Sequence, residues 1–397
     1  MTLKTKIQEL SELYFEDIRQ IRRTLHANPE LSFNEHETSG YIKQNLEEIG
    51  IAYREISDTG ITGEIKGNKT GNRVIAVRAD IDALPVEEKN NVTYTSKNPG
   101  IMHACGHDAH TASLIGALKI LKNLQDDFGG TIKFIFQPAE EKLPGGAQEL
   151  IKAGVLENPR PDLIIGQHVY PDLPARAIGY RPGPYMASTD EIFLTIQGKG
   201  GHGAMPHKIN DTVLAASQTI STLHQNIHRF SPASIPTVLS FGKVIANGAT
   251  NVIPDEVRID GTFRTMNEKW RQEAHQMIKT TAESISKTQN THCTVEIKKG
   301  YPVLHNDEKV TTKAMEISKS YLGKQHIEDL DIRMTAEDFA YYTQEIPGTF
   351  FRLGTGNTIN EPTHPLHSSN FNIDEEALKT GMGHLAWLAM GFLKEVT

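Results

Sequence analysis

The chain has 397 residues, of which 38% are hydrophobic and 23% are charged, and its net charge is −8 at pH 7. This composition is that of a soluble globular protein, the length predicts two domains, and the acidic balance without a long basic run argues against a nucleic-acid partner. No apolar run reaches membrane-spanning length, the charged start predicts no signal peptide, and two cysteines form no disulfide framework, so we expect a cytoplasmic protein.

The first part of the chain alternates between helical and strand-like patterns. We predict helices at 7–28, 37–50 and 111–124 and strands at 73–78, 131–136 and 163–165. Such alternation predicts an α/β fold on a mixed, mainly parallel sheet flanked by helices. Several polar residues follow the predicted strand ends, where open sheets of this kind place their ligand sites.

The middle of the chain has a different order of predicted strands and helices. It consists of strands at 191–197, 234–245, 256–265 and 292–298 and helices at 211–226 and 268–287. The order βαββαβ is typical of a ferredoxin-like α+β unit. The first pattern then resumes with a helix at 307–322, a strand at 348–353 and a helix at 375–393. We therefore predict one discontinuous domain, 1–185 with 299–397, and an inserted domain, 186–298.

Residues 102–110, Met-His-Ala-Cys-Gly-His-Asp-Ala-His, indicate a metal centre. A soft thiolate at Cys105 and an imidazole at His107 can bind the same transition-metal ion. Gly106 between them lets the backbone bend so that both point inward. The type of metal is left open, because such ligands accept zinc, manganese, cobalt or nickel.

Further metal-type side chains follow other predicted strands or lie in loops. With Cys105 and His107, the candidate ligands are Glu141, His168 and His367. Five ligands suit two metal ions that activate a water for hydrolysis better than one closed structural site. The adjacent carboxylates of Glu140 and Glu141 can divide their roles, one binding metal and the other moving a proton. Asp82 could hold a histidine ligand in one tautomer. Each residue alone has an ordinary explanation as a polar or core residue, and it is their grouping that favours a metal site.

The inserted domain offers two polar turns. His202 lies in a glycine-rich stretch, residues 199–207, that forms either an ordinary hairpin or helix entry or a loop that presents a histidine to a substrate oxyanion. Asn251 lies in the second turn, residues 247–254.

Taken in order, these segments resemble the motifs of the M20 metallopeptidase family. The matching stretches are Arg78-Ala-Asp-Ile-Asp-Ala-Leu-Pro85, Met102-His-Ala-Cys-Gly-His-Asp-Ala-His110, Gln137-Pro-Ala-Glu-Glu141, Gly200-Gly-His-Gly-Ala-Met-Pro-His207, Asn251-Val-Ile-Pro-Asp255 and His364-Pro-Leu-His-Ser-Ser-Asn370. The likeness is greatest to the amidohydrolase branch, which includes hippurate hydrolases, N-acyl-L-amino acid amidohydrolases and plant auxin-conjugate hydrolases.

The resemblance implies a zinc-peptidase-like catalytic domain with an inserted lid, and a homodimer formed through the lid or a higher oligomer. It implies two divalent metal ions per subunit, held by Cys105, His107, Glu141, His168 and His367. Glu140 would be the general acid/base and Asp82 would support a ligand. His202 would reach the active site of a partner subunit, and Asn251 would contact substrate. Asp80 stands where the peptidase branches carry a histidine ligand, which leaves the bridging ligand open.

We therefore expect an enzyme that hydrolyses the amide bond of small N-acyl-L-amino acids. The nearest alternative is a dipeptidase or aminopeptidase of the same family. A non-catalytic ligand-binding protein on this fold is disfavoured by Glu140, because a binder needs no proton carrier. A zinc deaminase would need a Cys-x-x-Cys pair, which the sequence lacks.

Overall fold

The computed structural model describes residues 1–357 and 364–394 and divides into two compact units. Unit 1 comprises Met1–Gly183, His305–Asp331 and the described residues from Asp338 onward, and unit 2 comprises Pro184–Leu304 with Ile332–Glu337. The short segment Ile332–Glu337 falls in the first domain of the predicted division. It belongs to unit 2 in the structure because the backbone N–H of Ala187 donates to the carbonyls of Arg333 and Thr335.

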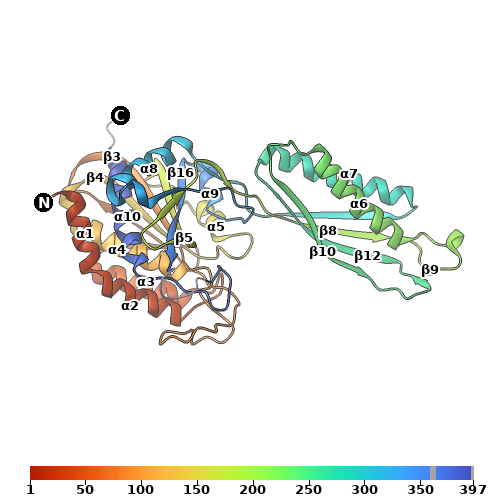
Figure 1. The fold of residues 1–397 in the computed structure, drawn as a ribbon, viewed down its shortest axis with the longest axis horizontal. Helices are drawn as coiled ribbons and strands as arrows, with labels where there is room; N and C mark the ends of the chain where they lie inside the picture. The colour runs from red at the N-terminus through yellow and green to blue at the C-terminus, as the bar shows by residue number, and fades with distance from the viewer. Residues whose placement is uncertain (358–363, 395–397) are drawn as a thin grey trace. The chain divides into compact units, whose positions relative to one another are not determined.

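Unit 1 is built on an eight-stranded sheet with the order β1-β2-β4-β3-β5-β16-β6-β15 (Figure 1). The strands are β1 (Tyr53–Ile56), β2 (Gly60–Lys66), β3 (Lys69–Asp80), β4 (Gly129–Gln137), β5 (Leu163–Pro174), β6 (Ile178–Tyr180), β15 (Ile327–Asp329) and β16 (Gly348–Gly356). The central strands β4, β3, β5 and β16 run parallel, which brings their carboxyl ends to one edge. The mixed, mainly parallel sheet is as predicted.

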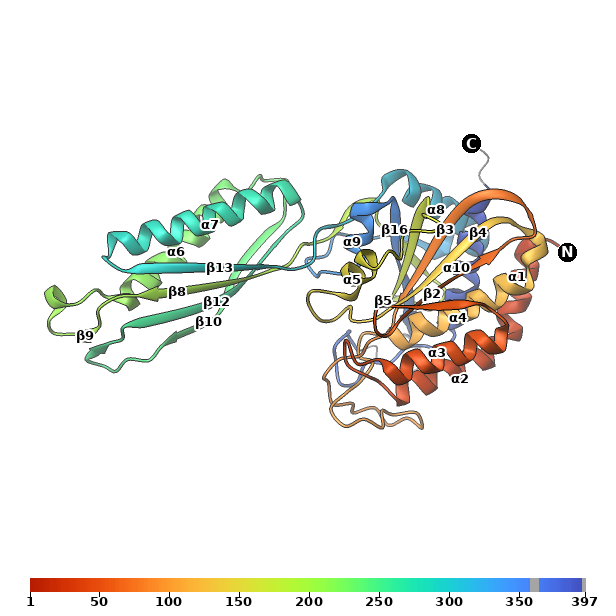
Figure 2. The same cartoon turned by 180° about the vertical axis from the view of Figure 1, so that it is seen from behind.

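Helices cover this sheet and enclose the core of unit 1. They are α1 (Leu3–Leu13), α2 (Phe15–Ala27), α3 (His36–Ile49), α4 (His107–Asn123), α5 (Gly146–Lys152), α8 (Glu308–Leu322), α9 (Ala340–Glu345) and α10 (Ala377–Leu393). Figure 2 shows α4 beside the sheet with α2 and α3 outside it. Almost every residue of α4 is buried, as expected of a helix enclosed between two layers. Among the described residues, no helix combines the length and apolar character that a membrane crossing requires.

Several predicted elements of unit 1 differ from the observed ones. The helix predicted over 7–28 is two helices separated at Tyr14. Tyr14 itself has a right-handed helical backbone, and its N–H donates to the carbonyl of Leu10, so the apolar face stays continuous across the break. Helix α4 begins four residues earlier than predicted, directly at His107. Strand β5 continues to Pro174, so His168 lies within a strand and not beyond its end.

Unit 2 forms the predicted ferredoxin-like fold. Its elements are β8 (Asp190–Gln197), β9 (Gly201–His202), α6 (Thr212–Phe230), β10 (Thr237–Ala246), β11 (Val252–Ile253), β12 (Glu256–Thr265), α7 (Glu268–Thr288) and β13 (His292–Lys299). The antiparallel sheet has the order β10-β12-β8-β13, and α6 and α7 pack on it and on each other (Figure 1). β7 (Gly183–Met186) and β14 (Leu304–Asn306) lie where the chain passes between the units.

The side chains of unit 2 explain these elements. Ile192, Leu194 and Ile196 alternate with more exposed residues along β8, which is the period-2 pattern of a sheet with one covered face. The helices begin where side chains cap them: Asp211 accepts the N–H of Leu214 at 2.8 Å, and Asn267 accepts that of Trp270 at 2.9 Å.

Gly106 connects Cys105 to α4 in a conformation that only glycine adopts freely. Its φ is +81°, and a Cβ atom there would lie 2.5 Å from Cγ2 of Val169. We expect Gly106→Ala to lower the free energy of unfolding of the metal-free protein by about 2–4 kcal/mol, of which roughly 1 kcal/mol is backbone strain and the rest is crowding. Denaturant unfolding would measure the loss.

Gly154 provides a matched control for this substitution. Its φ is also +81°, but a Cβ atom would meet no heavy atom within 4 Å. Gly154→Ala should therefore cost only about 1 kcal/mol, which is the backbone strain alone. Equal losses in the two variants would show that Val169 moves aside at no cost.

Candidate metal centre

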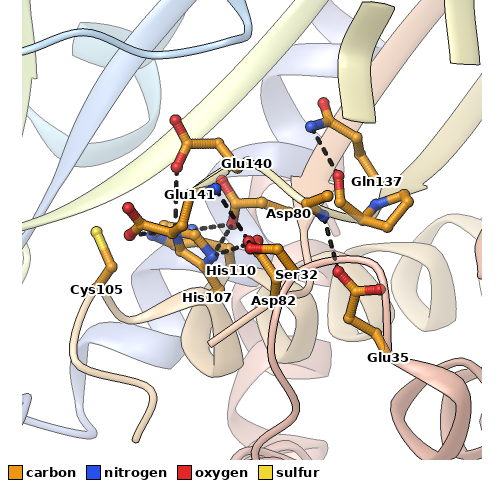
Figure 3. A network of polar contacts seen from close by, with 12 residues as sticks. Ser32, Glu35, Asp80, Asp82, Cys105, His107, His110, Gln137, Glu140 and Glu141 are labelled. Atoms are coloured by element: carbon orange, nitrogen blue, oxygen red, sulfur yellow. Dashed lines mark hydrogen bonds and ion pairs between the residues drawn. The ribbon is translucent and has the colours of Figure 1, made fainter. Parts of the chain in front are cut away.

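The candidate ligands gather at the carboxyl edge of the central strands of unit 1. Glu140 and Glu141 follow β4, and His107 opens α4. The last pair between β3 and β5 is Arg78 with Gly166, so His168 stands two residues beyond it, level with the end of β3. Figure 3 shows Cys105, His107, Glu140 and Glu141 directed toward a common centre. The site thus lies where parallel sheets place ligands, even though β5 itself runs further.

Two groups of donor atoms meet at Cys105. Cys105, His107 and His168 form one group, and Cys105, Glu141 and His367 form the other, with the donor atoms of each group within 4.8 Å of one another. The thiol sulfur lies 3.4 Å from Nε2 of His168, and Oε1 of Glu141 lies 3.4 Å from Nε2 of His367. The sulfur of Cys105 would be shared if ions occupied both of these groups, while His107 also forms a group with Glu140 and Glu141.

Hydrogen bonds at one ring nitrogen direct the other nitrogen of two histidines into the site. Nδ1 of His107 lies 3.1 Å from Oδ1 of Asp82, and Nδ1 of His168 lies 2.8 Å from the carbonyl of Val169. A donor proton on each Nδ1 leaves the lone pair of Nε2 available, which is the arrangement that metal-binding histidines use. Asp82 therefore contacts Nδ1 of His107, and its supporting role at a metal centre stays a prediction.

The buried atoms of this centre fit a cation. Nε2 of His107 and Oε1 of Glu141 are buried, lie 3.9 Å apart and have no hydrogen-bond partner among the described residues. Burying such atoms without a partner is costly, and a divalent ion would satisfy both. The donor set of thiol, imidazole and carboxylate is one that transition-metal ions accept.

Ionisation of the site also favours a bound cation. Burial and the charges of Glu141 and Glu140 raise the pKa of the Cys105 thiol, so a thiolate there needs positive charge nearby. Burial disfavours a charged His107, but the carboxylates of Asp80 and Asp82 outweigh it and raise the pKa of His107 to about 10. Divalent cations would neutralise the excess negative charge and bind His107 as the neutral ring.

The remaining histidines of residues 102–110 lie outside the two groups at Cys105, although His110 forms a further donor group with Asp80 and His107. Nδ1 of His110 lies 2.6 Å from Oδ1 of Asp80, and its Nε2 accepts the N–H of Val169 at 2.8 Å. Asp80 in turn binds Arg78 at 2.6 Å, so it is engaged on both oxygens. His103 is fully buried away from the two donor groups, and burial lowers its pKa to about 4.

The turn that carries Glu140 and Glu141 is held by three buried acidic residues. Ala139 has φ of +53°, a left-handed conformation that costs a non-glycine residue about 1–2 kcal/mol. The N–H of Ala139 donates to Oε1 of Glu35 at 2.8 Å, and the N–H of Glu141 donates to Oδ2 of Asp82 at 3.0 Å. Oε1 of Glu140 accepts the backbone N–H of Asp338 at 3.3 Å. Glu35 and Asp338 escape sequence reasoning, because no local pattern links them to this turn.

His202 and Asn251 lie together in unit 2. β9 pairs with β11 so that His202 lies opposite Val252, and the N–H of Gly203 donates to the carbonyl of Asn251 at 2.9 Å. Both side chains are exposed. The structure therefore brings these two predicted substrate contacts together at one two-stranded sheet of unit 2, and the metal-type residues belong to unit 1.

Comparison with known proteins identifies the family. The model of peptidase family M20/M25/M40 matches residues 76–390. The chain belongs to this family. It is 41% identical over 359 residues to N-acetyl-L-cysteine deacetylase of Bacillus subtilis, covering 90% of this chain and 84% of that protein. It is 41% identical over 307 residues to N-acyl-L-amino acid amidohydrolase of Geobacillus stearothermophilus, covering 77% and 82%.

A solved structure of the M20 family shares the fold. The crystal structure of a dinuclear metal-binding peptidase of the family from Bacillus subtilis superposes with a TM-score of 0.83 at 36% identity, covering 97% of this chain and all of that one. Membership of the M20 family, with these relatives, shows that the chain is a metal-dependent amidohydrolase. The fold and the family resemblance inferred from the sequence are thereby confirmed.

Proposed function

We propose that this M20 protein hydrolyses N-acyl-L-amino acids, releasing a carboxylic acid and the free amino acid. The observation that carries the proposal is the pair of donor groups sharing Cys105, with Oε2 of Glu140 only 4.0 Å from Nε2 of His107. A carboxylate that could carry a proton thus lies beside the donor atoms that two ions would use, and this supports hydrolysis. Relatives named for N-acetyl-L-cysteine and for N-acyl-L-amino acids support this substrate class.

In this proposal the residues divide the reaction among themselves. Cys105, His107 and His168 would hold one divalent ion, and Cys105, Glu141 and His367 would hold the other. Two such ions would supply Lewis acidity to the amide carbonyl and to an attacking water. Glu140 takes a proton from the water and returns it to the amide nitrogen, so that the C–N bond breaks and the amine leaves neutral. Asp82 keeps His107 in the tautomer that exposes Nε2.

Unit 2 completes the proposed enzyme as its lid. His202 donates a hydrogen bond to the developing oxyanion and Asn251 contacts the substrate. Exposure of both side chains at one two-stranded sheet supports a role in binding something outside unit 2. The lid domain also forms the homodimer in this proposal, so that His202 of one subunit serves the site of its partner.

A substrate panel tests the proposal against a dipeptidase. Purified protein reconstituted with zinc, manganese, cobalt or nickel would be assayed on N-acetyl and N-benzoyl amino acids beside dipeptides of the same residues. We expect kcat/KM to be at least about tenfold higher for the N-acyl compounds, because an acylated nitrogen brings no free ammonium that would have to lose its water at the site. Protein carrying Glu140→Gln, prepared in parallel, serves as the blank for contaminating hydrolases.

The two other outcomes have separate meanings. Faster cleavage of dipeptides would favour the dipeptidase or aminopeptidase alternative. Stoichiometric metal with no turnover of either class would contradict an amidohydrolase for N-acyl amino acids.

A further inference from the structure

We propose that Glu35 is a positioning residue for the catalytic turn: its carboxylate holds Ala139 in the left-handed conformation that directs Glu140 and Glu141 into the metal centre. The inference rests on the proposed function for its kinetic consequences, but its structural core is independent of the substrate. Figure 3 shows the carboxylate of Glu35 reaching the backbone just before Glu140.

From its position in the chain, Glu35 would be expected to cap the N-terminus of α3. Glu35 is the residue at the N-cap of α3, yet its side chain makes no capping hydrogen bond. Glu30 caps that helix instead, because its carboxylate accepts the N–H groups of Glu37 and Thr38 and the hydroxyl of Thr38. With the helix end already satisfied, Glu35 turns inward and is fully buried.

The donors around Glu35 all fix backbone or buried side chains. Oε1 accepts the N–H of Ala139 at 2.8 Å and that of Phe33 at 3.0 Å, and Oε2 accepts the hydroxyl of Thr59 at 2.9 Å. Phe33 has φ of +68° and Ala139 has φ of +53°, so a single carboxylate oxygen binds the N–H groups of two left-handed residues. The N–H of Gly146 donates to the carbonyl of Ala139 at 2.9 Å, so the peptide groups on both sides of Ala139 are held.

The consequence for the metal centre follows from chain geometry. Ala139 precedes Glu140 directly, and Glu141 is only two residues away. If Ala139 relaxed to a right-handed conformation, the chain direction after it would change, and both carboxylates would leave the positions that they share with Cys105 and His107. Ser32, three residues before Glu35, donates to Oδ2 of Asp82 at 2.6 Å, so one segment supports both anchors of the turn.

Two substitutions at Glu35 separate the effect of side-chain length from the effect of charge. Glu35→Gln keeps an oxygen in place of Oε1 and loses the charge, and the hydroxyl of Thr59 can rotate to accept from the new amide. Glu35→Asp keeps the charge and withdraws the carboxylate by one methylene. If Glu35 positions the turn, the Gln variant should stay within about threefold of wild type in kcat and in metal dissociation constants. The Asp variant should lose about 10–100-fold in kcat and about tenfold in metal affinity, with KM changed less than kcat.

Glycine at 139 provides a rescue. Ala139→Gly alone should leave kcat within about threefold, because glycine adopts φ near +53° without strain. Combined with Glu35→Asp it should recover about fivefold in kcat and in metal affinity. Glu30→Ala is the control for a lost carboxylate in the same segment: it should lower Tm and leave metal affinity unchanged.

Metal affinity is measured by chelator competition with zinc, kcat and KM with an N-acetyl amino acid, and Tm by thermal unfolding. If Glu35→Asp lowers Tm alone, or if the Gln variant loses as much metal affinity as the Asp variant, the positioning role is overturned. Wild-type protein that binds metal but cleaves no N-acyl amino acid would contradict the proposed function. The order of metal affinities, Gln above Asp, would still decide the role of Glu35.

Discussion

Glu140→Gln should bind metal ions as the wild type does and lose about 10³-fold in kcat. The amide has the shape of the carboxylate and can still accept the N–H of Asp338, which lies 3.3 Å from Oε1. It cannot take a proton from water or return one to the leaving nitrogen, and general acid/base groups contribute roughly 10²–10⁴-fold to turnover. A 10³-fold loss corresponds to about 4 kcal/mol of transition-state stabilisation. Steady-state kinetics and metal stoichiometry on the same preparation would measure both effects.

The neighbouring glutamate provides the matched comparison. Glu141 belongs to the donor group of Cys105 and His367, and its buried Oε1 has no hydrogen-bond partner among the described residues. Glu141→Gln should therefore lose metal and, with it, activity. Metal loss in Glu140→Gln would instead make Glu140 a ligand, and wild-type turnover in that variant would remove it from proton transfer.

The metal-type residues could be predicted from the sequence because their chemistry is local. Cys105 and His107 flank a glycine, and two glutamates stand together after a strand. The short spacing within each pair already limits the directions in which the two side chains can point. The Cys-Gly-His spacing selects His107 among the three histidines of that stretch, but the partners of His110 could not be predicted, because they are Asp80 and Val169 from other strands.

The errors in the fold have a similar origin. Residues 169–174 contain two prolines and an aspartate, which argue against a strand. They nevertheless extend β5 because β16 offers a parallel partner from far along the chain. Glu35 was missed for the same reason. Nothing near it in sequence shows that its carboxylate would bind the backbone of Ala139, 104 positions away, because such contacts exist only after the sheet and α3 have packed.

Cys105→Ala should lose both metal ions and reduce kcat by at least about 10³-fold. The sulfur belongs to both donor groups, whereas His168 and His367 belong to one each. Removing a shared ligand weakens two sites at once and leaves the remaining carboxylates unbalanced in a buried space. Metal analysis after gel filtration, with kcat on an N-acetyl amino acid, would measure the effect. Cys293→Ala is the control, since Cys293 is also buried but lies in unit 2, outside both donor groups.

Comparing the metal content of variants at single ligands tests whether both ions share Cys105 more strictly than the metal loss of Cys105→Ala alone. His168→Ala and His367→Ala should each weaken mainly one ion, so each variant should retain about one metal per chain under conditions that empty Cys105→Ala. If Cys105→Ala instead retains one ion, the sulfur serves a single site and another atom must be shared. Oε1 of Glu141 is then the leading candidate, because it lies within 4 Å of nitrogens from both groups, Nε2 of His107 and Nε2 of His367.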